Sequence, residues 1–182
     1  STDKVYNTCV ICGPDGTIVA KHRKVHLFDI DIPNKIRFIE SEVLTAGDQI
    51  TVFDTPFGKV GVGICYDIRF PELAAAMSAR DAKVLVYPGA FNMATGPLHW
   101  ELLQRARAVD NQCFVITTAP ARVEDGGYCS WGHSTIIDPW GKILATCEAE
   151  ATTIRAKLDF ASLDEVRASI PVRRQRRPEL YI

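Results

Sequence analysis

GVGICYDIRFPEL, residues 61–73, joins an apolar, glycine-spaced run to a cysteine and places a proline just before a helical pattern. On an extended strand the side chains alternate between two faces, so Cys65 shares its face with Gly61 and Gly63, which carry no side chain. Glycine inside a strand commonly marks the close approach of another backbone or of a ligand. Pro71 is typical of the first position of a helix. The stretch therefore predicts a strand that ends at Cys65, followed by a helix.

Cys65 has two interpretations. A thiol just before the N-terminal end of a helix is favoured as the thiolate, and the layout is that of a nucleophile elbow without the G-x-S-x-G spacing of serine hydrolases. Buried cysteine is also a common core residue. A cysteine hydrolase usually needs a histidine base, and no pattern singles one out. The candidate histidines are His22, His26, His99 and His133. The residues alone thus leave a nucleophile without an identified base, or a core thiol.

The remaining chain predicts an α/β fold. Apolar runs separated by turn residues predict strands, and helical spacing or an N-terminal proline predicts helices. We expect a hairpin before residue 24, an irregular segment over 25–50, strands over 51–65, 83–88, 113–121, 132–147 and 152–159, and helices over 71–82, 96–112 and 160–170. Strand, helix and strand within some thirty residues around Pro71 predict a βαβ-like unit with a buried sheet.

The predicted helix over 96–112 has apolar residues at helical spacing. They are Leu98, Leu102, Ala106 and Val109, and the charged residues fall largely between them. This pattern is typical of a helix that covers a sheet with its apolar face. The tail over 171–182 carries four arginines and two prolines, which exclude a continuous helix.

Composition limits the partners of this chain. Its 182 residues fit one domain, and 21 Lys and Arg against 22 Asp and Glu give a net charge of −1. This balance predicts no general attraction to nucleic acid or to an anionic membrane. No apolar stretch approaches the roughly 20 residues that cross a bilayer, and residues 1–8 have no signal-peptide pattern. We expect a cytosolic protein, with mitochondria as the alternative compartment.

Two of the six cysteines form a CxxC pair. They are Cys9 and Cys12, in the segment NTCVICG, which has β propensity. On a strand, positions i and i+3 point to opposite faces, so these two thiols cannot bind the same metal ion. The irregular spacing of the other cysteines does not indicate a disulfide framework. We expect two half-buried strand thiols and no metal site.

Five ordered blocks carry a resemblance to a known family. They are KHRKVHLFDIDIP, GICYDIRFPEL, YPGAFN, HWELLQRARAVDNQ and WGHSTIIDPWG. Together they resemble the carbon-nitrogen hydrolase, or nitrilase, superfamily, and within it the omega-amidase branch, along essentially all 182 residues. The resemblance implies an α/β fold of the four-layer αββα sandwich type, here incomplete at the N-terminal side. Residues 1–182 would then be the C-terminal part of a single domain.

The resemblance also implies site residues. The family's catalytic cysteine falls on Cys65, its lysine on Lys24 and a supporting acid on Glu40. The Lys24 ammonium is expected to lower the pKa of the Cys65 thiol and to face the oxyanion, together with the backbone N–H of Tyr66, while Glu40 holds the lysine by charge pairing. Without the resemblance, Lys24 would pass for one of four solvated basic residues and Glu40 for a surface carboxylate.

Phe91 and Asn92 follow the strand that ends in YPGA, so their position predicts either pocket residues or packing residues. The implied reaction is hydrolysis of a small-molecule amide through a cysteine thioester, with 2-oxoglutaramate and 2-oxosuccinamate as substrates. Those substrates carry a carboxylate, so a cationic or N–H-rich pocket wall is expected.

One part of the implied machinery has no counterpart in these residues. The family's general-base glutamate matches no position, so this chain alone is expected to be inactive or impaired. The rivals are an amidase for deaminated glutathione, from the same superfamily, and a non-catalytic binding or scaffold subunit. The resemblance implies no metal or organic cofactor. It implies a homodimer formed through helices beside the active site, with the arginine-rich tail over 171–182 reaching across.

Overall fold

The structure is a computed structural model that describes residues 3–34, 36–125 and 127–181. Its strands are β1 (Thr8–Cys12), β2 (Ile18–Arg23), β3 (Asp29–Ile32), β4 (Ile36–Ile39), β5 (Thr51–Thr55), β6 (Gly58–Val62), β7 (Ala82–Pro88), β8 (Phe114–Thr118), β9 (Thr135–Ile137) and β10 (Ile143–Thr146). Its helices are α1 (Pro71–Ala79), α2 (Glu101–Asn111), α3 (Phe160–Ser169) and α4 (Val172–Gln175). Four short helical turns complete the set: η1 (Glu40–Glu42), η2 (Cys65–Arg69), η3 (Gly96–Trp100) and η4 (Pro178–Leu180).

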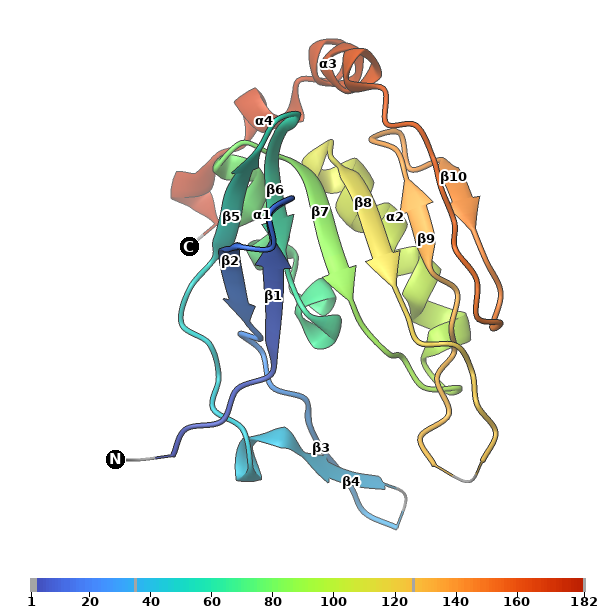
Figure 1. Cartoon of the computed structure of the whole chain (residues 1–182). Helices are drawn as coiled ribbons and strands as arrows, with labels where there is room; N and C mark the ends of the chain where they lie inside the picture. Colours follow the sequence, from blue (N-terminus) through green and yellow to red (C-terminus); the bar gives the residue numbers. More distant parts are fainter. Residues whose placement is uncertain (1–2, 35, 126, 182) are drawn as a thin grey trace.

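A mixed sheet of six strands forms the centre of the molecule, in the order β10-β9-β8-β7-β6-β5 (Figure 1). The pairs β6–β7 and β7–β8 are parallel, and the other neighbours are antiparallel. Helices α1 and α2 cover one face of this sheet (Figure 1). The hairpins β1–β2 and β3–β4 stand apart from it as two-stranded sheets. The predicted α/β class and the βαβ unit β6–α1–β7 are confirmed.

The glycine-spaced run of β6 allows helix α1 to pack closely on the sheet. A Cβ atom on Gly61 would lie 2.7 Å from Met77 Sδ on α1 and 3.0 Å from a Leu85 methyl on β7. A Cβ on Gly63 would lie 2.5 Å from the Tyr87 ring. Real Cβ atoms do not approach so closely, so both positions need glycine. The predicted close approach is therefore found, and its partner is the protein's own core.

The predicted orientation of helix α2 is wrong. The side chains of Leu98 and Leu102 are exposed, at 68% and 64%, and Val109 is half exposed. The buried face is instead polar: Gln104, Arg107 and Asn111 lie there with Ala108. Helical spacing identifies residues that share a face, but not which face turns inward.

The neighbours of α2 explain why its polar face is buried. Thr117 Oγ1 on β8 donates to Gln104 Oε1 at 2.9 Å, and Arg107 Nε donates to the carbonyl of Ile68 at 2.9 Å. Asn111 Nδ2 donates to the carbonyl of Arg107 at 3.0 Å. Buried polar groups are tolerated when they find such partners. The apolar stripe is left on the outside.

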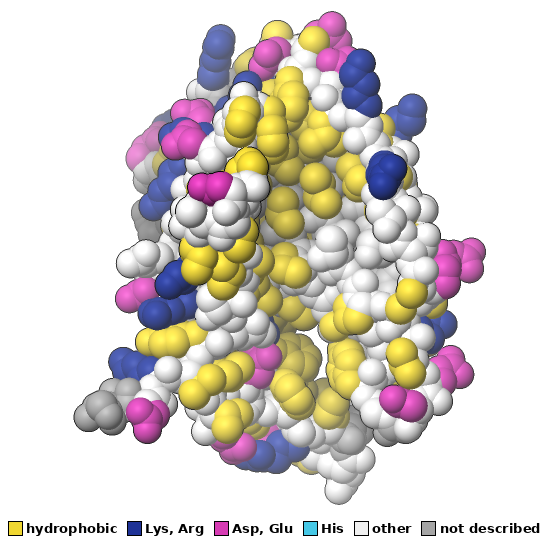
Figure 2. Space-filling model, viewed as in Figure 1, with side chains coloured by type: hydrophobic (Ala, Val, Ile, Leu, Met, Phe, Trp, Pro, Cys, Tyr) yellow, Lys and Arg dark blue, Asp and Glu magenta, His cyan; other side chains and the backbone are white. Residues whose placement is uncertain are grey.

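The other face of the six-stranded sheet is apolar and partly open. Figure 2 shows hydrophobic side chains gathering in a hollow over this face. The cluster comprises buried Val60, Val84, Phe114 and Leu163 and half-buried Phe53, Val86, Ile116, Leu144, Leu158 and Phe160. The described residues form one large sheet with helices on one face, and the second large sheet of a four-layer sandwich is not among them.

Two further segments differ from expectation, and the tail makes a contact that the sequence did not predict. The segment over 25–50 is not wholly irregular, because it contains the hairpin β3–β4. Residues 152–159 are extended, with alternating half-buried side chains, but the described residues give them no strand ladder. The arginine-rich tail folds back on its own chain: Arg173 Nη2 donates to the Ser78 carbonyl at 2.6 Å. No helix among the described residues is long and apolar enough to cross a membrane.

Candidate active site

Cys65 lies at a turn and not within a strand. Strand β6 ends at Val62, and Cys65 opens the 3₁₀ helix η2 with a backbone φ of 48°. A non-glycine residue in this left-handed region is uncommon and strained, and such residues concentrate at functional sites. The expectation that the strand continues to Cys65 is therefore wrong, because β6 ends at Val62 and the chain turns at Cys65. The turn directs the thiol toward the loop after β7, where Cys65 Sγ contacts the carbonyl of Ala90 at 3.7 Å.

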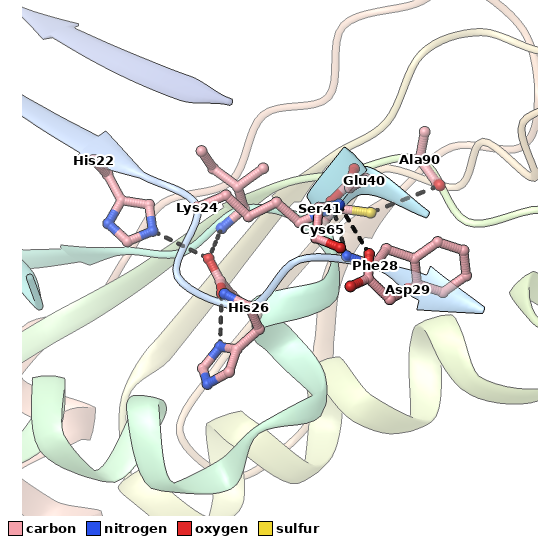
Figure 3. Close-up of polar contacts among 11 residues, drawn as sticks. His22, Lys24, His26, Phe28, Asp29, Glu40, Ser41, Cys65 and Ala90 are labelled. Carbon is pink, nitrogen blue, oxygen red and sulfur yellow. Dashed lines mark hydrogen bonds and ion pairs between the residues drawn. The ribbon is translucent and has the colours of Figure 1, made fainter. Parts of the chain in front are cut away.

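Lys24 and Glu40 form a largely buried ion pair. Lys24 follows β2 and its side chain is 2% exposed, whereas Lys21 and Arg23 on the same segment are exposed. The Lys24 Nζ atom lies 2.6 Å from Glu40 Oε2, which also accepts the backbone N–H of Phe28 at 2.8 Å. The side chains of Lys24, Glu40 and Cys65 converge from three different segments (Figure 3). Lys24 is thus not one of a solvated basic cluster.

A cavity of 790 Å³ brings the predicted residues together. Its lining includes all six of them: Lys24, Glu40, Cys65, Tyr66, Phe91 and Asn92. The rest of the wall is mostly apolar, which is typical of small-molecule sites. Among the described residues that line this cavity, Glu40 is the carboxylate and Lys24 and Arg69 are the cations. We call this space the Cys65 cavity.

Burial decides the direction of the Cys65 titration. Desolvation raises the pKa of the Cys65 thiol, and the charges of Lys24 and Arg69 lower it less than burial raises it; Glu40 adds to the increase. The expected lowering by Lys24 is therefore found, but the net shift is upward, because removing water from the sulfur destabilises the thiolate more than the lysine stabilises it. At neutral pH the thiol is therefore the favoured form.

The histidines do not supply a base to this cavity. His22 and His26 are bound to the carboxylate of Asp67, and His99 Nδ1 lies 3.2 Å from Arg69 Nη1. His133 stacks on Trp131 with ring centroids 4.2 Å apart. None of the four is among the described residues that line the cavity.

Sequence reasoning missed three residues around the nucleophile. One of them is Asp67, which is fully buried. Burial raises the pKa of its carboxyl group, but hydrogen bonds from His22, from the Ile64 N–H and from His26 outweigh burial, so the net pKa is lowered.

The other two are Arg69 and Tyr128. The Arg69 guanidinium lies 4.6 Å from the centre of the Phe91 ring and lines the cavity. Tyr128 Oη donates to the Ala90 carbonyl at 2.8 Å, the carbonyl that Cys65 contacts. Asp67 and Arg69 both stand in the stretch over 61–73, but nothing in their spacing indicated where their side chains lie.

The described cysteines and acids do not form a metal centre. Groups of three or more His, Cys, Asp or Glu side chains that could hold a metal ion are absent from the part of the chain that the structure describes. Cys9 on β1 is half-buried as expected, but Cys12 is exposed, so the expectation of two half-buried thiols is wrong for Cys12. The alternating exposure of β1 accords with the prediction that these two thiols point to different faces.

The chain matches known proteins over nearly all its length. A family model for carbon-nitrogen hydrolases matches residues 1–168. Omega-amidase NIT2 of Xenopus tropicalis is 62% identical over 178 residues, which are 98% of this chain and 64% of that protein. A solved structure that matches is the crystal structure of Saccharomyces cerevisiae Nit3, described as a member of branch 10 of the nitrilase superfamily. It superposes with a TM-score of 0.88 at 48% sequence identity, and the match covers 97% of this chain and 61% of Nit3.

A second solved structure, the NitFhit protein of Caenorhabditis elegans, superposes with a TM-score of 0.92 at 42% identity. The match covers 98% of this chain and 44% of that one. The chain therefore spans less than two thirds of the length of each of these three proteins.

Proposed function

Since the chain belongs to the carbon-nitrogen hydrolase family, we propose that it carries the nucleophile side of an omega-amidase active site. The substrates of the proposed reaction are 2-oxoglutaramate and 2-oxosuccinamate, and the products are the 2-oxo acid and ammonia. One observation carries the proposal: Cys65, at a strained turn, opens into a cavity that also holds the buried Lys24–Glu40 pair. The 62% identity to an omega-amidase supports the choice of substrate class.

The proposed chemistry is acyl transfer through a thioester. Cys65 Sγ attacks the carboxamide carbon, the C–N bond breaks, and the thiol proton leaves with the nitrogen as ammonia. The Lys24 ammonium and the Tyr66 backbone N–H face the oxyanion of the tetrahedral intermediate, where one such donor contributes about 3 kcal/mol. Water then adds to the thioester carbon, the C–S bond breaks, and the acid and the free thiol are released.

Arg69 is the proposed anchor for the substrate carboxylate. It lines the cavity on the side of Phe91, and its guanidinium is fixed by that ring and by His99. A planar guanidinium binds a carboxylate through two parallel hydrogen bonds. Lys24 is already paired with Glu40, which leaves Arg69 as the second cation among the described lining residues.

The second half-reaction needs a base for water. Glu40 Oε2 already accepts from Lys24 Nζ and from the Phe28 N–H, so we assign Glu40 to hold the lysine and not to activate water. The resemblance gives no counterpart here to the family's general-base glutamate. We therefore propose that the 182-residue chain acylates and then hydrolyses the thioester slowly.

Intact mass and released ammonia test this proposal. The chain and its Cys65→Ala variant are each incubated with 2-oxoglutaramate. We expect the chain to gain a covalent acyl adduct with a burst of ammonia near one equivalent, and the variant to show neither. Absence of adduct and ammonia from both proteins would favour a non-catalytic scaffold. Faster cleavage of deaminated glutathione than of 2-oxoglutaramate would instead assign the chain to that amidase.

We also propose that these residues are part of one four-layer αββα domain that pairs as a homodimer. The apolar hollow on the six-stranded sheet is the face that a second sheet would cover. The exposed Leu98 on η3 and Leu102 on α2 support a protein contact at this helical segment. Sedimentation velocity of the chain, with Leu102→Glu as the comparison, tests the dimer; a monomer at all concentrations would contradict it.

A further inference from the structure

One buried carboxylate ties two distant segments together. Asp67 Oδ2 accepts the Ile64 N–H at 2.8 Å and lies 3.1 Å from His22 Nε2. Asp67 Oδ1 accepts the His26 N–H at 2.9 Å and lies 2.8 Å from His26 Nδ1 (Figure 3). The side chains of Asp67 and His22 are both fully buried. Four contacts to one buried carboxylate make an unusually constrained arrangement.

The positions of these partners in the chain matter. His22 and His26 stand two residues before and two residues after Lys24. Ile64 and Asp67 stand one residue before and two residues after Cys65. The carboxylate therefore connects both sides of the proposed lysine to both sides of the proposed nucleophile.

The Asp67 network lies outside the wall of the Cys65 cavity. Asp67, His22 and His26 are not among the described residues that line the Cys65 cavity, so none of them is placed to touch a substrate. His22 is also fixed by Thr51 on β5, at 3.0 Å from its Nδ1. The His26 ring stacks on Phe70 with centroids 3.6 Å apart and an interplanar angle of 7°. Both imidazoles are thus held on two sides.

The other polar contacts of Lys24 are its ion pair with Glu40 and two backbone hydrogen bonds. The Lys24 N–H donates to the Asn7 carbonyl at 2.9 Å, and the Lys24 carbonyl accepts from the Gly47 N–H at 2.8 Å. These bonds fix Lys24 to residues that precede β1 and β5, and not to the turn that carries Cys65. Among the described residues, the Asp67 network is the direct polar link between the Lys24 segment and that turn.

We infer that Asp67 is a positioning residue, which sets the Lys24 ammonium against the Cys65 thiol by binding His22 and His26. Loss of the carboxylate therefore uncouples the lysine from the thiol, even in a chain that still folds. The inference rests on the proposed function only for the role given to Lys24, because the contacts themselves are structural.

A double-mutant cycle on Cys65 alkylation tests this coupling. The four proteins are the unmodified chain, Lys24→Met, Asp67→Asn and the double variant. Each is treated with iodoacetamide over a range of pH, and the Cys65 peptide is quantified by mass spectrometry. The charged groups that face Cys65 are Lys24, Glu40 and Arg69, and the last two are unchanged throughout.

The expected result is a loss of coupling. In the unmodified background, Lys24→Met removes a cation near the sulfur, so alkylation below the thiol pKa slows roughly tenfold, equivalent to about one pKa unit. In the Asp67→Asn background the same substitution changes the rate by less than about twofold. An equal effect of Lys24→Met in both backgrounds would overturn the inference.

Controls separate positioning from general destabilisation. Ser78→Ala removes a buried hydroxyl that donates to the Asn111 carbonyl at 3.2 Å, away from the site. We expect it to lower the melting temperature and to leave the effect of Lys24→Met intact. If Asp67→Asn does not fold, His26→Phe replaces it, because phenylalanine keeps the stacking on Phe70 and the backbone N–H but loses the ring contact to Asp67. An unchanged effect of Lys24→Met in that background would also refute the inference.

The alkylation readout is independent of turnover. If the chain forms no acyl adduct with 2-oxoglutaramate, the proposed function is refuted. The alkylation cycle still reports whether Asp67 couples Lys24 to Cys65. Conversely, if the chain forms the acyl adduct but shows no coupling, the proposed function stands and this inference is refuted.

Discussion

Two cavities of nearly equal volume have very different surroundings. The Cys65 cavity measures 790 Å³, and a second one measures 760 Å³ between α3, the end of α1 and the tail. We call the second the arginine-lined cavity, because Arg167, Arg173, Arg174 and Arg176 contribute to its wall. In the Cys65 cavity, Lys24 is 2% exposed and paired with Glu40. In the arginine-lined cavity, Arg173 pairs with Asp81, whose side chain is 77% exposed.

The difference shows that the volume of a cavity alone does not indicate a functional site. Water screens exposed charges, and exposed ion pairs contribute about 0–1 kcal/mol. Charges removed from water act much more strongly on a neighbouring group. The arginines of the second cavity also bind carbonyls at the ends of helices, as Arg176 Nη2 does with Asp110 O at 2.5 Å. Their contacts are those of a tail held on the body, whereas the Cys65 cavity combines a strained thiol with an enclosed ion pair.

Lys24→Met is expected to have the largest effect. It removes the ammonium that faces the oxyanion, and loss of one such donor slows the reaction about 10²- to 10³-fold. The measurement is the initial rate of acyl-adduct formation with 2-oxoglutaramate. Lys21→Met is the matched control, because Lys21 is exposed on β2 three residues away. If both variants acylate at the same rate, the buried pair is not part of the chemistry.

Arg69→Gln is expected to weaken substrate binding more than it slows the chemistry. Hydrogen bonds to charged groups contribute about 1.5–3 kcal/mol, so the 2-oxoglutaramate concentration at half-maximal acylation should rise roughly ten- to a hundredfold. A neutral amide without a carboxylate, such as butanamide, provides the comparison. Its half-maximal concentration should not change. A similar increase for both amides would show that Arg69 supports the cavity and does not bind the carboxylate.

Gly89→Ala is expected to have a moderate effect on both stability and reactivity. A Cβ at this position would lie 2.8 Å from Cys65 Cα and 3.2 Å from the Trp100 ring, so the nucleophile turn must shift. Overpacking of this kind costs about 1–3 kcal/mol of unfolding free energy. Chemical denaturation and Cys65 alkylation measure the two consequences. Ala79→Ser adds one atom to the arginine-lined cavity, where the side chain is exposed, and should change neither quantity.

The same two cavities show what the sequence could predict. The strand, turn and helix around Cys65 follow from local rules, because glycine and Pro71 constrain the backbone directly. Lys24 and Glu40 came from the family resemblance alone. Their burial depends on a fold that brings residues 24, 40 and 65 together, and no local pattern in a basic cluster reveals it.

The errors have physical causes too. The period over residues 96–112 identified Leu98 and Leu102 as one face, but Gln104 and Arg107 on the other face are buried and hydrogen-bond to Thr117 and the Ile68 carbonyl. The pKa of Cys65 depends on how much water the folded cavity removes, which a linear sequence does not state. Asp67 was overlooked because its importance lies in four contacts to three residues spread over residues 22–64.

Arg174→Gln is expected to have the smallest effect, and we compare it with Arg173→Gln in the same arginine-lined cavity. Arg174 is exposed, and surface substitutions away from specific contacts change the unfolding free energy by less than about 0.5 kcal/mol. Arg173→Gln removes the bonds of Nη2 to the Ser78 carbonyl and to Asp81, so it should cost about 0.5–1.5 kcal/mol. Neither should alter Cys65 alkylation. Thermal denaturation distinguishes the two variants, and if Arg174→Gln costs as much as Arg173→Gln, then the charge of the cavity and not the individual contact determines how the tail is held.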